Sequence, residues 1–332
     1  PKQYVDLFRE AAANDGKVDF AEGLSGFPTE QDAIDFYVDY FETEFLDFFS
    51  LGTDWRNLEV DTDWQAQLYN KNANAHQADV SFSGGTEKTR FFISGFYNTQ
   101  EAIVINNKFS RYGGRFNLEH NATDWLSIGM NAAVSRSQLD RVSNDNAFST
   151  PGQLVAQLPI SPLIDPNTGK TNRNTLYANG LLDAEFNTDK QITFRTIGNI
   201  FGNFKLSNSL QFRSEFGTVI LNLYQEQYNG KDGIDGAGIG RSAFIVSQSV
   251  SFNTNNYFSW APKIANDNHK VNAIVGMSYL QNDLRQASAS GENHPSDAVK
   301  NLAGATEVTS GNSINSRYTF LSYFLRGTYA LM

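Results

Sequence analysis

The stretch SFSGGTEKTRFFISGFYNTQEAI, residues 81–103, contains the pattern that decides the fold of this chain. It alternates polar and apolar side chains, turns at Gly84 and Gly85, and then alternates again. A period of two is typical of a β-strand with two different faces, and a glycine-containing turn joins two such strands as a hairpin. The sequence therefore predicts an antiparallel hairpin in which one face contacts an apolar environment.

The same alternation recurs along the chain. In residues 126–134 the even positions are Leu, Ile, Met, Ala and Val, whereas most odd positions are small or polar. Because successive side chains of a strand point to opposite faces, each segment has one apolar face and one polar face. The predicted class is all-β, with strands at 76–83, 89–98, 109–120, 125–137, 190–206, 209–223, 250–264, 269–281 and 316–330.

Composition limits the possible functions. The chain has 332 residues, of which 40% are hydrophobic, so it can form a packed structure. A formal charge of −10 without any basic stripe argues against nucleic acid as a partner. There is no cysteine and hence no disulfide or thiolate chemistry. The sequence contains no run of about 18 apolar residues, which a transmembrane helix would need. The mean hydropathy of −0.42 is nevertheless compatible with barrel strands, which expose only every second side chain to lipid.

Short and long connections alternate along the sequence. The short polar turns are predicted at 84–88, 120–124, 207–208 and 265–268, and the other connections at 99–108, 138–189, 224–249 and 282–315. If successive strands are antiparallel neighbours, all short turns lie at one edge of the sheet and all long loops at the other. This asymmetry is typical of outer-membrane barrels, which have short periplasmic turns and long extracellular loops. The segment 191–206 would extend about 50 Å, far more than an ordinary globular strand.

The alternation also predicts which side chains face lipid and which face the barrel lumen. The predicted lipid-facing residues include Phe91, Ile93, Tyr97, Phe116, Leu118, Phe212, Phe216, Leu321, Tyr323 and Leu325, and the predicted interface aromatics are Tyr97, Tyr112, Trp260 and Tyr329. The candidate lumen-lining or substrate-contacting residues on strands are Arg90, Asn98, Arg111, Arg115, Asn131, Arg195, Asn199, Arg213 and Glu215. The candidate residues in loops are Phe148, Tyr177, Tyr224 and Tyr228.

The first 75 residues differ from the rest. Residues 30–49 place Ile34, Tyr37, Val38, Phe41, Phe45 and Phe48 at helical spacing, with seven acidic residues and no basic one. This pattern predicts a short amphipathic helix in an extracellular loop region, residues 1–75, which precedes the barrel domain at 76–332. The helix could pack within its own loop, or on the barrel rim or a partner lipoprotein.

The sequence offers no catalytic or metal-binding pattern. The four histidines have no metal-like spacing, and the motif GAGIG at 236–240 lacks the helix that a dinucleotide site needs. The motif DPNTG at 165–169 lacks the bidentate glutamate of a calcium loop. We therefore predict no enzyme activity, no metal and no cofactor.

Several longer stretches together resemble the SusC/RagA family of TonB-linked outer-membrane transporters. They are TDWQ at 62–65, the hairpin at 80–103, FSRYGGRFNL at 109–118 and DWLSIGMNAAVSRS at 124–137, and the similarity extends from residues 3–12 through 204–217 and 268–279 to 317–329. Their order and spacing carry the resemblance. Ala102 is a departure, because the family usually has glycine there.

The resemblance implies a fold and a function. It implies part of a 22-stranded transmembrane antiparallel up-and-down barrel with an N-terminal plug, in the bacterial outer membrane. It also implies import of oligosaccharides or peptides, with the TonB complex, a SusD-like surface lipoprotein and outer-membrane lipid as partners. Nine strands are too few for such a barrel, so we expect an internal piece of its wall, without the plug. A passive porin or surface-adhesion barrel and a soluble carbohydrate-binding β protein remain as alternatives.

Overall fold

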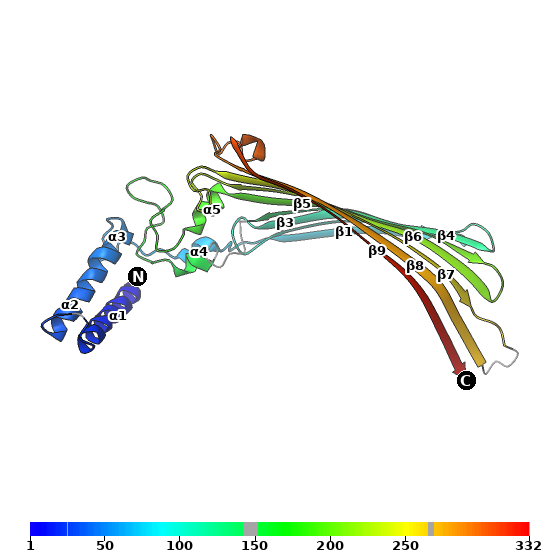
Figure 1. Cartoon of the computed structure of the whole chain (residues 1–332), viewed down its shortest axis with the longest axis horizontal. Helices are drawn as coiled ribbons and strands as arrows, with labels where there is room; N and C mark the ends of the chain where they lie inside the picture. The colour runs from blue at the N-terminus through cyan, green and yellow to red at the C-terminus, as the bar shows by residue number, and fades with distance from the viewer. Residues whose placement is uncertain (25, 142–151, 265–268, 332) are drawn as a thin grey trace.

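The structure, a computed structural model, describes residues 1–24, 26–141, 152–264 and 269–331. Nine strands form an antiparallel sheet in which each strand pairs with its neighbours in sequence, in the order β1 to β9 (Figure 1). The strands are β1 Ala75–Gly85, β2 Thr89–Glu101, β3 Lys108–Asn121, β4 Leu126–Arg141, β5 Thr188–Lys205, β6 Leu210–Asn229, β7 Arg241–Trp260, β8 His269–Glu292 and β9 Glu307–Leu331. The predicted all-β, up-and-down topology is confirmed, and β1 and β9 form the two edges of a sheet that does not close.

Short turns gather at one end of the sheet and long connections at the other. Figure 1 shows the helices and the longer connections at the left end and the described tight turns at the right end; the predicted turn at 265–268 lies outside the described residues. The helices are α1 Lys2–Ala21, α2 Glu30–Tyr40, α3 Asp47–Ser50, α4 Trp64–Leu68 and α5 Gly180–Phe186, with a π-helical turn η1 Phe41–Leu46 and 3-10 turns η2 Gly152–Ala156 and η3 Leu302–Gly304. None of the described helices is long and apolar enough to cross a membrane.

The predicted helix at 30–49 corresponds to α2, η1 and α3, which follow one another without a break. Its start is fixed by a capping box, in which the Thr29 side chain accepts a hydrogen bond from the Asp32 amide and the Asp32 carboxylate accepts one from the Thr29 amide. Helix α1 was not predicted from the sequence. It packs closely on α2 because Gly16 has no side chain: a Cβ atom there would lie 2.8 Å from the Ala33 carbonyl oxygen.

Strands β6 to β9 are longer than predicted. The predicted segments end at 223 and 281 and begin at 250 and 316, whereas the strands continue to 229 and 292 and begin at 241 and 307. The predicted loops 224–249 and 282–315 therefore shrink to 230–240 and 293–306. The reason lies in the pattern: Leu280 and Leu284 lie on the face that is polar farther down β8, so the apolar face changes sides within the strand. A barrel strand needs about 9–11 residues to cross a bilayer, so much of β8, with 24 residues, lies beyond it.

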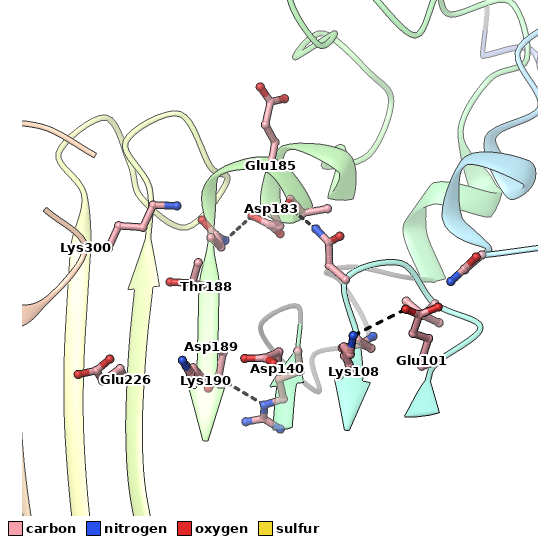
Figure 2. Close-up of a pocket in the computed structure, with 18 of the residues that line it drawn as sticks. Glu101, Lys108, Asp140, Asp183, Glu185, Thr188, Asp189, Lys190, Glu226 and Lys300 are labelled. Atoms are coloured by element: carbon pink, nitrogen blue, oxygen red, sulfur yellow. Dashed lines mark hydrogen bonds and ion pairs between the residues drawn. The ribbon is translucent and has the colours of Figure 1, made fainter. Parts of the chain in front are cut away.

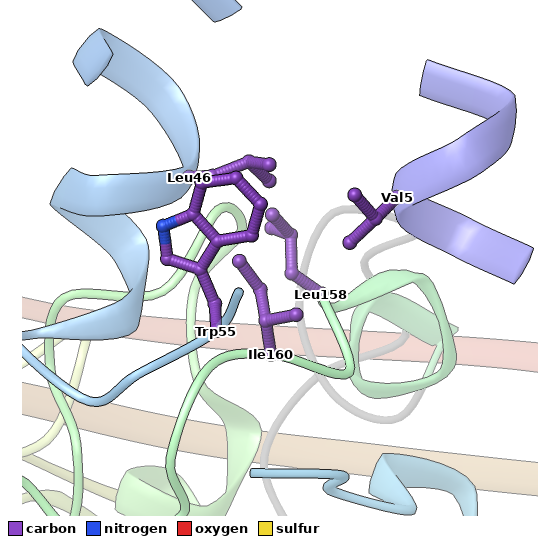
Figure 3. Packing of buried hydrophobic residues seen from close by; sticks show 5 residues of the cluster. All are labelled: Val5, Leu46, Trp55, Leu158 and Ile160. Carbon is purple, nitrogen blue, oxygen red and sulfur yellow. The ribbon is translucent and has the colours of Figure 1, made fainter. Parts of the chain in front are cut away.

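The buried core lies outside the sheet. One cluster contains Val5, Leu46, Trp55, Leu158 and Ile160, from α1, the end of η1 and two connections (Figure 3). A second cluster contains Trp64, Leu68 and Leu154. Both clusters join the first 75 residues to the connection between β4 and β5, so these two segments, far apart in sequence, pack as one unit.

Candidate functional site

The sheet has one apolar face, defined by the strand register. Phe204, Phe212, Phe258, Val275 and Leu325 lie directly opposite one another across β5 to β9. Opposite residues of an antiparallel pair share a face, and the rings of Phe212 and Phe258 lie 4.8 Å apart. These side chains are not covered by any other described element, and a wide apolar row of this kind is suited to hydrocarbon. We call this face outward and the other inward.

Aromatic side chains border the outward apolar band at both ends. Tyr97 and Tyr112 lie opposite each other at the long-loop end, next to Arg136. Trp260 and Tyr329 lie toward the short-turn end and are exposed. Amphipathic rings favour the membrane–water interface, so the four residues mark the two edges of the band, as the sequence analysis expected.

The inward face collects the candidate lumen-lining residues of the strands. Asn131 lies opposite Asn199, Arg111 opposite Asn98, and Arg90 opposite Glu119. By register, all nine strand candidates lie on this face: Arg90, Asn98, Arg111, Arg115, Asn131, Arg195, Asn199, Arg213 and Glu215. Sequence alternation alone indicated this grouping.

Inward aromatic rings lie across glycines of the neighbouring strand and carry stacked arginines. Phe96 lies opposite Gly113, where a Cβ atom would come within 2.8 Å of the ring. The Arg111 guanidinium lies 5.1 Å from the centre of the same ring. The stack holds the arginine on the wall while its charge still faces the lumen. No local pattern indicates the position of Phe96, because the contact of its ring with a glycine of another strand depends on the strand register.

Arg213 is likewise stacked on an aromatic ring that lies across a glycine, and it has further polar partners. Its guanidinium lies 4.1 Å from the ring of Phe201, which in turn lies across Gly129. Arg213 donates a hydrogen bond of 2.9 Å to Asn203 and pairs with Glu215. These contacts fix its orientation beside a shallow cavity of about 420 Å³, whose other lining residues include Lys205, Gln211, Tyr257 and Ser259.

The inward face is cationic away from the rim. Its basic side chains there are Arg90, Arg111, Arg115, Arg195, Lys205, Arg213, Lys270 and Arg326, and its acidic ones are Asp79, Glu119 and Glu215. At the rim, Arg141 pairs with Asp189 at 2.8 Å and Arg241 with Glu292 at 3.5 Å. The excess of positive charge on the wall favours anionic or carboxylate-bearing groups in the lumen.

The three loop candidates that the structure describes do not join the inward group. Tyr224 and Tyr228 belong to β6, beyond its predicted end, and their register places them on the outward side. Tyr177 lies in the β4–β5 connection, where its backbone exchanges hydrogen bonds with the Gln157 side chain. Phe148 lies outside the described residues.

Tyr228 fastens the β8–β9 connection to the end of β6. Its hydroxyl donates a hydrogen bond of 2.6 Å to Asp297, which also accepts one from the Lys231 amide, and its ring packs edge-on against His294. Burial, followed by the bond to Asp297, raises the pKa of the Tyr228 phenol above its ordinary range. Burial acts to raise the pKa of Asp297 as well, but the bonds from Tyr228 and Lys231 and the lysine charges nearby outweigh it and lower that pKa. The contact therefore holds a neutral phenol against a carboxylate.

A cavity of about 780 Å³ lies at the long-loop rim (Figure 2). Residues of alternating charge face one another across five strands on its wall: Glu101, Lys108, Asp140, Lys190 and Glu226. This row belongs by register to the outward side, whereas Arg141 and Asp189, which also line the cavity, belong to the inward side. Among the described residues, no group of three or more carboxylates and histidines is arranged to hold a metal.

Comparison with known proteins gives a consistent result. No family model matches the chain. The TonB-dependent receptor P3 of Formosa agariphila is 23% identical over 283 residues, which cover 81% of this chain and 28% of the relative. The TonB-dependent receptor P26 of the same organism is 23% identical over 272 residues, covering 77% and 27%.

Solved structures match the fold. A structure of the RagAB peptide importer in its closed-closed state has a TM-score of 0.73 at 20% identity and covers 95% of this chain and 37% of that one. A structure of the RagAB peptide transporter has a TM-score of 0.71 at 19% identity, with 90% and 36% covered. At this identity the structural matches show the fold alone. The chain spans about a quarter to a third of the length of the proteins that it matches.

These matches confirm two predictions from the sequence. The resemblance to TonB-dependent outer-membrane transporters is confirmed by the curated relatives and by the barrel fold of the RagAB structures. The location in the bacterial outer membrane is confirmed with it. The relatives are receptors and transporters rather than enzymes.

Proposed function

We propose that this chain forms part of the wall and the extracellular loops of a TonB-dependent transporter that imports oligosaccharides or peptides together with a SusD-like surface lipoprotein. The observation that carries the proposal is the sidedness of the nine strands: an apolar outward band and a cationic, polar inward face in one register. Such a wall separates lipid from a hydrated lumen. The matched structures are those of a peptide transporter, and this supports a substrate of this size class.

Within this proposal, the inward arginines bind substrate or plug and perform no covalent chemistry. Arg111 and Arg213 are stacked on rings and so lose little conformational freedom when they bind a carboxylate. The polar amides opposite one another, such as Asn131 and Asn199, add donors and acceptors for hydroxyl or peptide groups. This arrangement suits transient binding along a passage.

Energy dependence separates an active transporter from a passive porin. The test measures growth on, and uptake of, labelled oligosaccharides and peptides in cells that carry the intact protein, with TonB present or deleted. We expect uptake of one class to stop when TonB is deleted. Uptake that continues at the same rate without TonB would support the porin instead.

We propose that the helical hairpin formed by α1 and α2 is the surface that contacts the lipoprotein. Residues 1–50 carry twelve acidic and three basic side chains, a net charge of −9 out of −10 for the whole chain. Phe36, Tyr40 and Phe48 are exposed on the same helical segment, at intervals of four and eight residues. Exposed aromatic rings within an acidic surface suit a partner that offers basic and apolar groups. The charge argues against a second copy of the hairpin and against anionic lipid.

Charge removal on the hairpin tests this contact. Asp35→Asn with Asp39→Asn removes two exposed acids, and we expect less lipoprotein to co-purify with the intact transporter. The difference from the unaltered protein should shrink at higher salt, because salt screens the charge attraction that these acids supply. The matched control, Glu87→Gln with Asp124→Asn, removes two exposed acids near the short-turn end and should leave co-purification unchanged. Equal recovery in both pairs of variants would assign the lipoprotein to another surface.

A further inference from the structure

The upper edge of the outward apolar band can be located strand by strand. On β6 and β7 the outward residues change from Ile220 and Val250 to Asn222 and Gln248, which lie opposite each other and share a hydrogen bond of 2.9 Å. On β8 and β9 the outward residues change from Tyr279 and Leu321 to Gln281 and Thr319. Strands of a barrel are tilted by about 45°, so a boundary parallel to the membrane crosses the hydrogen-bonded rows obliquely, as observed.

A groove lies on the outward face directly above this edge. Two adjoining hollows of about 340 and 490 Å³ meet at Arg285 and Asn315, which line both of them. The small or slim side chains of Val246, Ala287 and Ser313 lie along its floor, opposite one another on β7, β8 and β9. We define the headgroup groove by its polar and aromatic residues: Asn222, Tyr224, Gln248, Arg285, Ser313 and Asn315.

One cation of the groove, Arg285, has no direct ion pair among the described residues, and the acid whose charge it interacts with, Asp283, also lines the groove. Arg317 pairs with Asp283, and Asp283 also accepts a hydrogen bond from Gln281, which is bonded to the Tyr279 hydroxyl. The Asp283 carboxylate beside the groove is therefore already paired with Arg317 and hydrogen-bonded to Gln281. Arg285 is exposed, and the described part of the chain gives it no ion-pair partner within 4 Å. Its five donors are therefore available to an anion.

We propose that the headgroup groove binds the phosphorylated sugar headgroup of an outer-leaflet glycolipid. Arg285 would contact a phosphate, the amides of Asn222, Gln248 and Asn315 would hydrogen-bond sugar hydroxyls, and the exposed Tyr224 ring would pack on a sugar face. The acyl chains of the same molecule would lie on the apolar row below, against Ile220 and Val250.

The position of the groove determines the kind of ligand. One step of two residues separates Ile220 from Asn222, about 7 Å along the strand and less along the membrane normal. This is the depth at which hydrocarbon gives way to headgroups. The outward face of a barrel wall meets lipid whatever the rest of the protein contributes to the lumen, so the plug and the lipoprotein do not cover the groove. The inference rests on the outer-membrane location and is independent of the proposed substrate and of TonB.

The amount of lipid that stays bound to the purified protein measures binding to the headgroup groove. The intact protein is extracted in mild detergent, and native mass spectrometry counts bound lipid, followed by titration with purified lipopolysaccharide, phosphatidylglycerol or inorganic phosphate. We expect lipopolysaccharide to be retained and its affinity to fall at least about tenfold in Arg285→Gln, the loss expected for a charge-assisted hydrogen-bonded contact. Arg285→Lys should recover part of the affinity, because lysine keeps the positive charge but lacks the planar guanidinium that makes two parallel hydrogen bonds to a phosphate.

The matched control is Arg326→Gln, which removes the same charge from the inward face. Both variants are checked for heat-modifiable migration of the folded barrel. The proposal is overturned if Arg285→Gln retains as much lipopolysaccharide as the unaltered protein, if Arg326→Gln loses as much, or if phosphatidylglycerol binds equally well. Binding of inorganic phosphate with the same affinity would also overturn it, because the sugar would then contribute nothing.

Discussion

The sidedness of the wall predicts opposite effects for two adjacent residues of β5. Ile200 is outward, between Met130 and Phe216 on the neighbouring strands, and 53% exposed because nothing but lipid would cover it. The outward apolar residues of β5 run from Ile192 to Phe204, so Ile200 lies near the middle of the bilayer. An arginine on the lipid face at this depth costs about 2–4 kcal/mol in a barrel. Ile200→Arg should therefore lower the folding equilibrium constant roughly 30- to 900-fold.

Asn199→Arg is the control, because it adds the same side chain one residue away on the inward face, opposite Asn131 and Gly217. The guanidinium would face a hydrated lumen there, and we expect little loss of stability. The assay is denaturant titration of the intact protein folded into lipid vesicles, read by the change in migration between folded and unfolded barrel. Equal destabilisation by the two variants, or a larger loss for Asn199→Arg, would refute the assignment of the faces.

Three further predictions concern the parts outside the bilayer. Trp55→Ala should lower the stability of the helical unit by about 3–5 kcal/mol, because Trp55 is only 2% exposed in its cluster. Hydrogen exchange in α1 should then accelerate, and unchanged exchange would show that the cluster does not hold the helix. Gly16→Val should separate α1 from α2, since the Cβ position is 2.8 Å from the Ala33 carbonyl oxygen, and protease resistance of the hairpin should fall; an equally resistant hairpin would contradict the packing. The carboxylate of Asp297 has a lowered pKa, so its contribution to the stability of the 293–306 connection is present above about pH 4 and is lost as the pH falls through the folded-state pKa. Asp297→Asn should abolish that acid-dependent loss of protection in hydrogen exchange, and a variant that keeps it would implicate another group.

Local alternation in the sequence determined which segments are strands and which side chains share a face. Residues 126–134 identify a strand with one apolar face because lipid and water act on alternate side chains, and this effect needs no distant partner. The antiparallel order followed from the lengths of the connections. The nine strand candidates, such as Arg115 and Arg195, share a face for the same local reason.

The tertiary structure decided what depends on residues far apart in sequence. Trp64 donates a hydrogen bond to the Leu158 carbonyl oxygen 94 residues away, and the stack of Arg213 on Phe201 needs Gly129 on another strand. No local pattern records such pairs. The long-loop ends of β6 to β9 were missed for a related reason. Above the bilayer the outward side becomes polar, so the alternation there no longer shows which face meets lipid. Sequence fixes which side chains alternate, whereas the position of each strand relative to the membrane decides which face is apolar at a given height.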